Sequence, residues 1–382
     1  MNIHPFPARM APELVDEKIA ELPEGSHILD PMCGSGTTLR RSIDAGHSAT
    51  GWDIDPLAVK MSRVRCRRYN VARLEKELAK ILLLTKRYQN SPLLFSECEK
   101  TVEFVDYWFA EKQMKELNAL SLAIDASLPL GRFRDFFHIA LSRIIITKFK
   151  GASLAWDISH SRPHRKKEKN EFETIPEFAK SVQKLMHHIE ANPSKKDAKV
   201  SLIDCRKTTA KTTFDAIITS PPYLNAIDYM RGHKFSLIWM GHTIPELTEI
   251  RSTSIGSESR RPNLEKNTRI VKIAEKVCSG KKINKRTKNI LLKYIDDCDQ
   301  FISSLQKHLK PNGSLVFVVA NSMQYGTRIK NDKILEVLAK DKGFELAERR
   351  QRHIPASSRY LPARSDSQIS KRMKTESVLQ FK

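Results

Sequence analysis

The spacing of apolar residues predicts an α/β sheet near the start of the chain. Residues 10–22 carry apolar side chains at helical spacing, and a Pro-Glu-Gly segment at 23–25 ends that helix. A strand is expected over 27–30, a helix over 37–45 and a second strand over 48–52. This order of strand, helix and strand is typical of one half of a nucleotide-binding fold.

The pattern then changes to helix over a long stretch. From residue 72 to residue 195, apolar side chains recur at helical spacing, as at Leu74, Leu78 and Ile81. Strand signals return later in the chain, over 199–203, 214–219, 314–319, 344–349 and 376–381. We therefore expect one α/β core in two parts, residues 1–70 and residues 198–382, separated by a helical insertion over 71–197.

The chain is strongly basic, which adds a polyanionic partner to this picture. Lys and Arg number 66 against 44 Asp and Glu, a formal net charge of +22. Such an excess favours a nucleic-acid partner over a merely soluble basic protein, because uncompensated positive charge destabilises the compact state. A basic insertion is expected over 245–292, either as a mobile, solvated linker or as a contact to the DNA backbone.

Cysteine usage and hydropathy exclude several classes of protein. The six cysteines are scattered, without a CxxC pair or zinc-ligand spacing, so we expect reduced thiols and no metal site. The N-terminus lacks the apolar run of a signal peptide, and no stretch of about 18 apolar residues occurs. We therefore expect a cytoplasmic protein without a membrane partner.

A glycine-rich turn follows the first expected strand. Gly34 and Gly36 stand between that strand and the next helix, where a turn without side chains lets backbone N–H groups approach a ligand. A glycine pair alone is also consistent with an ordinary strand-to-helix turn, so its meaning depends on the residues around it.

Acidic residues after the next strands supply that context. Asp53, with Asp55 as the runner-up, is placed to accept hydrogen bonds from both hydroxyls of a ribose. Ile54 would lie beside an adenine ring, and Asp204 would accept from the adenine amino group. Each acid alone fits a helix cap equally well, but together these residues describe an adenosyl pocket.

The segment Asp30-Pro-Met-Cys-Gly-Ser-Gly-Thr-Thr38 resembles the first motif of amino-directed DNA methyltransferases, with Met32 where that family usually has Phe. The resemblance implies a class I S-adenosylmethionine-dependent methyltransferase fold, a Rossmann-like sheet whose first part binds S-adenosyl-L-methionine. The contacts implied within this motif are Asp30, Pro31, Cys33, Gly34, Gly36 and Thr37. The segment 4–10 is similar to the family's tenth motif and makes Phe6 and Pro7 candidates for the methionine end of the cofactor.

Residues 214–223 predict a strand that ends in a turn with two consecutive prolines, which fix the backbone. An exocyclic amino nitrogen of a base is a poor nucleophile because its lone pair is delocalised into the ring. Ser220 through its hydroxyl and Pro221 through its carbonyl would accept from this amino group and direct the lone pair at a methyl donor. Tyr223 would stack on a base flipped out of the duplex. The candidate catalytic turn therefore consists of Ser220, Pro221, Pro222 and Tyr223. The alternative is a turn that only ends the strand and has no catalytic role.

The sequence Ser220-Pro-Pro-Tyr223 resembles the fourth motif of cytosine-N4 methyltransferases. Adenine-N6 enzymes, and guanine-N2 RNA enzymes that share the turn, more often have Asp or Asn in place of Ser220. The serine therefore favours cytosine N4, with adenine N6 next. Cytosine-C5 chemistry is disfavoured because it needs a thiolate, usually from a Pro-Cys pair, and the chain has no Pro-Cys dipeptide.

The order of the motifs makes the helical insertion a candidate for target recognition. Within it, residues 160–167 combine arginines able to bond guanine edges with lysines able to bind phosphates, or form a solvated loop. The candidate DNA contacts are Arg162, His164 and Arg165 in this segment, Arg231 after the catalytic turn, and Arg359 near the end of the chain. The pocket of the catalytic turn would be lined by Asp228, Tyr229 and Arg231, or these residues serve in capping and packing. Residues 107–109 are expected to be helix-packing core rather than a base-stacking platform.

These expectations combine into one function. The chain would be a site-specific DNA methyltransferase acting on N4 of cytosine in double-stranded DNA, with residues 198–382 as the catalytic part of the core. The family expectation adds a restriction-modification system with a cognate endonuclease, and epigenetic or phage-defence roles fit the same residues. The alternatives are adenine-N6 methylation of DNA, guanine-N2 methylation of RNA and a non-catalytic nucleic-acid-binding protein. The sequence does not indicate an oligomeric state.

Overall fold

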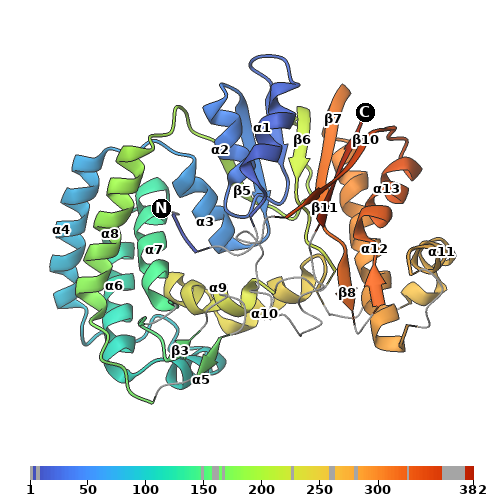
Figure 1. Ribbon diagram of the computed structural model, residues 1–382. Helices are drawn as coiled ribbons and strands as arrows, with labels where there is room; N and C mark the ends of the chain where they lie inside the picture. Colours follow the sequence, from blue (N-terminus) through green and yellow to red (C-terminus); the bar gives the residue numbers. More distant parts are fainter. Residues whose placement is uncertain are drawn as a thin grey trace.

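A central sheet of seven strands organises the protein (Figure 1). In this computed structural model, the described residues are 3–5, 9–147, 150–156, 163–165, 168–224, 228–257, 263–278, 283–324, 327–354 and 375–382. The strands, in the order they take across the sheet, are β10 (Leu346–His353), β11 (Thr375–Phe381), β7 (Leu309–Val319), β6 (Phe214–Thr219), β1 (His27–Asp30), β2 (Ser48–Asp53) and β5 (Lys199–Leu202).

The strand directions confirm the expected class I methyltransferase sheet. The pairs β1–β2, β1–β6, β2–β5 and β6–β7 are all parallel. β11, the strand expected at the end of the chain, lies between β7 and β10 and is antiparallel to both. The parallel strands therefore direct their carboxyl ends toward one edge, where ligands bind in open α/β sheets.

Helices cover both faces of the sheet because successive strand residues point to opposite sides. Ile28 belongs to a core with α1 (Pro12–Ala20), whereas Leu29 belongs to a core under α12 (Lys285–Gln306). The flanking helices are α1, α2 (Thr37–Asp44) and α3 (Pro56–Arg65) toward one side, and α11 (Thr268–Val277), α12 and α13 (Asn331–Asp341) toward the other. Within the described residues, no helix is long and apolar enough to span a membrane.

The region between β2 and β5 is mainly helical. After α3, its helices are α4 (Val71–Arg87), α5 (Glu99–Trp108), α6 (Glu111–Ser127), α7 (Arg132–Ile145) and α8 (Thr174–Ala191). A short antiparallel pair, β3 (Ala155–Trp156) with β4 (His164–Arg165), was not expected from the sequence. The interpretation of residues 107–109 as core is right for Phe109 and wrong for Tyr107, which is 51% exposed.

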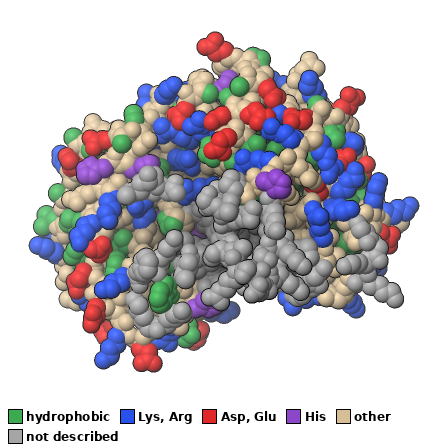
Figure 2. All heavy atoms as spheres, viewed as in Figure 1, with side chains coloured by type: hydrophobic (Ala, Val, Ile, Leu, Met, Phe, Trp, Pro, Cys, Tyr) green, Lys and Arg blue, Asp and Glu red, His purple; other side chains and the backbone are tan. Residues whose placement is uncertain are grey.

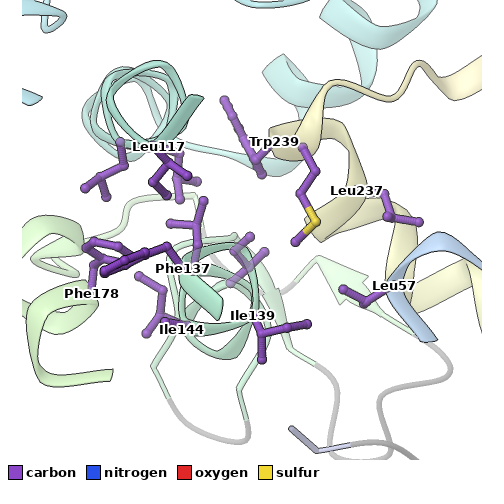
Figure 3. Packing of buried hydrophobic residues seen from close by; sticks show 14 of the residues in the cluster. Leu57, Leu117, Phe137, Ile139, Ile144, Phe178, Leu237 and Trp239 are labelled. Carbon is purple, nitrogen blue, oxygen red and sulfur yellow. The ribbon is translucent and has the colours of Figure 1, made fainter. Parts of the chain in front are cut away.

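The core of this helical region extends into residues that follow β6 in the chain. Those residues form α9 (Met230–Leu237), a short 3-10 helix over Ile238–Met240 and α10 (Ile244–Thr253). Trp239 is fully buried with Phe137 and Phe178 in one apolar cluster, which Leu57 of α3 also joins (Figure 3). The helical region therefore packs directly on the segment after the candidate catalytic turn.

The basic segment is more ordered than the sequence suggested. Over 263–278, α11 buries Ile270, Ile273 and Val277 in the core under α12. Arg269 on the same helix pairs with two carboxylates, at 2.9 and 3.2 Å. The expectation of a mobile linker is therefore wrong for this part, while residues 258–262 and 279–282 lie outside the described residues.

Candidate active site

The glycine-rich turn and Asp53 are joined at the carboxyl ends of β1 and β2. The Gly34 N–H donates to Oδ2 of Asp53 at 2.8 Å, and the Asp55 N–H donates to Oδ1 at 2.9 Å. The Cys33 N–H also donates to the Trp52 carbonyl at 2.9 Å. The turn is therefore held against the end of β2 by two of its own backbone donors, the N–H groups of Cys33 and Gly34.

The conformation of the turn requires glycine. Gly34 has φ +47° and Gly36 has φ +75°, the left-handed region that favours glycine. A Cβ added at Gly36 would lie 2.9 Å from Oγ of Ser62 on α3. The Ser62 hydroxyl in turn donates to the Gly34 carbonyl at 2.8 Å, so the turn packs closely on α3.

Asp53 retains free acceptor capacity, which fits a nucleoside. An ionised carboxylate has about four lone-pair sites, and the described contacts of Asp53 use one on each oxygen. The side chain is partly buried, and burial together with the charge of Asp55 raises the pKa of Asp53 to about 7. Two hydroxyl donors would complete its hydrogen bonds and stabilise the ionised form.

Asp55, the runner-up, is already committed to other partners. Its Oδ1 accepts from the Leu57 N–H at 2.9 Å, which caps α3, and its Oδ2 accepts from Nδ1–H of His233 at 2.5 Å. Burial opposes ionisation, but the charge of His233 and this bond outweigh it and lower the pKa of Asp55. The geometry therefore leaves Asp53 as the better placed ribose acceptor.

The other residues predicted to hold the cofactor lie along the same turn. Pro31 and Cys33 are buried, and burial raises the pKa of the Cys33 thiol well above its usual value. Thr37 begins α2 and accepts from the Arg65 guanidinium at 3.2 Å, while Ile54 is partly exposed after β2. Phe6 and Pro7 lie outside the described residues.

Asp204 follows β5 and forms an ion pair that the sequence did not reveal. Its carboxylate accepts from Nε and Nη2 of Arg206, at 2.9 and 2.7 Å. Arg206 also donates to Asp297 at 2.7 Å, and Asp297 accepts from Lys293 at 2.6 Å. Burial opposes the ionised form of Asp204, but the bonds from Arg206 outweigh it and lower its pKa. The position expected to face an adenine is therefore fixed by a buried arginine.

The candidate catalytic turn lies beside the cofactor turn. Thr219, the last residue of β6, donates its hydroxyl to Oδ1 of Asp30 at 2.8 Å. Asp30 ends the neighbouring strand β1, and burial raises its pKa to about 6. This buried bond places the two predicted motifs side by side at one edge of the sheet.

Within the catalytic turn, Oγ of Ser220 lies 3.5 Å from the hydroxyl oxygen of Tyr223. Burial raises the pKa of Tyr223 to about 12, so this hydroxyl stays protonated at neutral pH. The Pro222 carbonyl accepts from the hydroxyl of Tyr294 on α12 at 3.1 Å. Ser220 remains partly exposed, whereas Pro221 is buried.

The predicted DNA contacts are distributed over different parts of the molecule. Arg231 on α9 shares Asp228 with Arg251 on α10, with shortest N–O distances of 2.9 and 2.6 Å. Arg165 lies over the exposed ring of Tyr107, with its guanidinium carbon 4.7 Å from the ring centroid. His164 is exposed in β4, and Arg162 and Arg359 lie outside the described residues. On the face shown in Figure 2, Lys and Arg side chains lie on both flanks.

The sequence interpretation missed the long-range partners of the site. His233, Arg206 and Tyr294 hold predicted residues through side-chain bonds, but each belongs to no local pattern that would indicate such a role. Thr219 stood inside the motif without an assigned function. Among the described residues, no group of three or more His, Cys, Asp or Glu could hold a metal ion.

Comparisons with solved structures find weak similarity. A TehB-like SAM-dependent methyltransferase from Corynebacterium glutamicum has a TM-score of 0.31 at 11% identity, covering 96% of this chain and 86% of that one. A SAM-dependent methyltransferase from Methanosarcina mazei has a TM-score of 0.33 at 10% identity, covering 98% of each chain.

Comparisons with known sequences find distant relatives, although no family model matches. The type II methyltransferase M.MvaI of Kocuria varians is 24% identical over 378 residues, covering 88% of this chain and 80% of that protein. The type II methyltransferase M.AvaI of Nostoc sp. is 24% identical, covering 87% and 77%. M.BsoBI of Geobacillus stearothermophilus is 23% identical, covering 87% and 76%. The chain is thus a distant homologue of type II methyltransferases.

Proposed function

We propose that this protein transfers the methyl group of S-adenosylmethionine to the exocyclic N4 amino group of cytosine in double-stranded DNA. The observation that carries the proposal is the hydrogen bond between Thr219 and Asp30, which joins the candidate cofactor turn to the candidate catalytic turn. The distant relatives are type II methyltransferases, which supports a role in a restriction-modification system.

The cofactor would be held at the carboxyl ends of β1, β2 and β5. Asp53 would accept from the ribose hydroxyls and Ile54 would lie against the adenine. Asp204 would accept from the adenine amino group through the remaining lone pair of its Oδ2, because Arg206 uses both sites of Oδ1 and one of Oδ2. The methionine end would lie along the turn formed by residues 30–37, with Phe6 beside it. When bound, S-adenosylmethionine supplies an electrophilic methyl group on a positively charged sulfur.

The catalytic turn would activate the amino group by accepting its hydrogens. The Ser220 hydroxyl and the Pro221 carbonyl would draw the nitrogen toward tetrahedral geometry, so that its lone pair points at the methyl group. The Pro222 carbonyl is committed to Tyr294, which leaves the Pro221 carbonyl for this role. Tyr223 would stack on the flipped base and offset part of the cost of unstacking it. After transfer, the nitrogen loses one proton to solvent or to a nearby acceptor.

DNA would be attracted by the net charge of +22 and positioned by exposed arginines. Arg231 lies shortly after the catalytic turn, and Arg165 lies in the helical region that we propose for target recognition. The serine at position 220 supports cytosine over adenine as the target base, because the adenine-N6 and guanine-N2 enzymes similar in this turn more often carry Asp or Asn there.

Mass spectrometry of nucleosides from genomic DNA tests the proposal. The DNA would come from cells that express the wild type, the Ser220→Ala variant or Ser303→Ala, a control on α12 whose hydroxyl only bonds a carbonyl of its own helix. We expect N4-methylcytosine with the wild type and the control but not with Ser220→Ala. N6-methyladenine instead would contradict the base assignment, and methylated RNA without modified DNA would contradict the substrate assignment.

A further inference from the structure

A buried histidine outside the predicted machinery connects the two halves of the site. His233 lies on α9 and is 4% exposed, and its Nδ1–H donates to Oδ2 of Asp55 at 2.5 Å. Asp55 is 9% exposed and heads α3. Breaking a buried histidine–carboxylate pair leaves an uncompensated charge, so the start of α3 and the middle of α9 are strongly held together.

Asp55 continues this connection to the cofactor side. Its backbone N–H donates to Oδ1 of Asp53 at 2.9 Å, and the other oxygen of Asp53 is held by Gly34 of the glycine turn. A continuous path of hydrogen bonds therefore runs from the glycine turn through Asp53 and Asp55 to His233. The first and last of these bonds join distant parts of the chain, and the bond between Asp53 and Asp55 is local to the end of β2.

The other end of the path lies on α9, which follows the catalytic turn in the chain. α9 begins at Met230, seven residues after Tyr223 in the chain. The ring of Tyr229, directly before α9, lies 6.0 Å from the ring of His233. α9 follows the catalytic turn in the chain, and His233 bonds this helix to the cofactor side.

We propose that His233 is a positioning residue that couples occupation of the cofactor site to the placement of α9, the helix that follows the catalytic turn in the chain. The inference rests on the proposed function, because it takes S-adenosylmethionine as the ligand of Asp53. When ribose hydroxyls bond Asp53, its carboxylate and the Asp55 N–H are fixed, and the His233 bond carries that order to α9. By reciprocity, a substrate that orders α9 would strengthen cofactor binding.

Hydrogen exchange with S-adenosylhomocysteine as the probe tests this coupling without knowledge of the DNA site. In the wild type, the probe should slow amide exchange both in peptides from 31–57 and in peptides from 230–240. We expect the second effect to be about fivefold or more, the lower end of common coupling strengths. His233→Gln should keep the protection over 31–57 and lose the protection over 230–240.

Two further variants separate coupling from a loss of stability. Asp55→Asn removes the charge that His233 bonds but keeps a side chain that caps helices equally well, so it should also lose the protection over 230–240. His308→Gln is the matched control, because His308 is 2% exposed and its Nδ1 lies 3.0 Å from the Thr212 carbonyl, away from this path. It should keep both protected regions even if it lowers stability.

The outcomes distinguish the inference from the proposed function. Protection over 230–240 that persists in His233→Gln and Asp55→Asn would overturn the coupling, and so would a wild type protected only over 31–57. In both cases the proposed function would stand, because the cofactor site would still bind the probe. A wild type that shows no protection anywhere would overturn the proposed function on which the inference rests.

Discussion

Cofactor binding is expected to weaken as the pH falls through 7, because Asp53 must be ionised to accept two hydroxyl donors. Burial and the charge of Asp55 raise the pKa of Asp53 to about 7. A group with this pKa is roughly nine-tenths ionised one unit above it and one-tenth ionised one unit below it. The affinity for S-adenosylhomocysteine should therefore fall roughly tenfold between pH 8 and pH 6, which is about 1.4 kcal/mol of binding free energy.

Two substitutions assign this pH dependence to its source. Asp53→Asn should bind weakly at every pH and lose the tenfold change across pH 7, because the acceptor that titrates there is gone. Asp55→Asn removes the neighbouring negative charge and so lowers the pKa of Asp53, which should retain affinity at pH 6. Asp30, whose pKa is raised to about 6, titrates in the same range, and the Asp53→Asn profile separates its contribution.

The raised pKa of Asp53 also predicts that the ligand-free protein loses stability as the pH rises. A raised carboxyl pKa means that the folded state favours the neutral form, so the stability linked to Asp53 is fully present below pH 3.8 and is lost as the pH rises through about 7. A pKa raised from 3.8 to about 7 would correspond to about 4 kcal/mol of unfolding free energy for a fully buried group. Because Asp53 is partly exposed, we expect about 1–2 kcal/mol. Asp53→Asn removes this pH dependence but leaves either the Gly34 N–H or the Asp55 N–H without an acceptor, at a cost of about 1–3 kcal/mol. Urea unfolding should therefore show a smaller loss of stability between pH 4 and pH 8 in Asp53→Asn than in the wild type.

Calorimetry of S-adenosylhomocysteine binding at pH 6, 7 and 8, with urea unfolding of the same proteins, measures both effects. A wild-type affinity that is constant over this range would refute the argument that burial holds Asp53 near neutrality. A wild type that shares its pH profile with Asp53→Asn would refute the assignment to this carboxylate.

Three further predictions concern neighbouring parts of the site. Tyr294→Phe keeps the buried ring and loses the hydrogen bond to the Pro222 carbonyl, so the free energy of unfolding should fall by about 0.5–1.5 kcal/mol. Single-turnover methyl transfer should slow by about tenfold to a hundredfold, because the catalytic turn is less well positioned. Gly36→Ala forces a left-handed backbone and a 2.9 Å contact with α3, so urea unfolding should show a loss of about 1–3 kcal/mol. Arg231→Gln should reduce the slope of log DNA affinity against log salt by about 0.9, whereas Arg269→Gln should not, in fluorescence anisotropy titrations.

The fold was largely predictable because its signals are local. The glycine turn after β1, the acid that ends β2 and the prolines that end β6 each mark a strand end through the backbone that they require. The β3–β4 pair was not predictable, because two-residue strands leave no periodic pattern. The buried face of α11, formed by Ile270, Ile273 and Val277, was missed because the many Lys and Arg residues around it favour a solvated segment.

The residue types of the site were predictable, but their mutual contacts were not. His233 lies 178 residues after Asp55, and Tyr294 lies 72 residues after Pro222, so their bonds depend on packing that no local window contains. Asp204 shows the opposite difficulty. Its position after β5 was clear, but its pairing with Arg206 depends on a burial that only the tertiary structure supplies.

The apolar cluster that joins the helical region to α9 sets the size of the piece that could be grafted between related enzymes. A chimera that exchanged only residues 71–197 would cut through this cluster, because Phe235 and Trp239 are fully buried in it. Replacing the side chains around them would create cavities or overpacking that cost a few kcal/mol each. A single exchanged segment that keeps this cluster intact would have to run from before Leu57 to beyond Leu247, so new DNA specificity would be inherited together with β5, β6, the catalytic turn and α9.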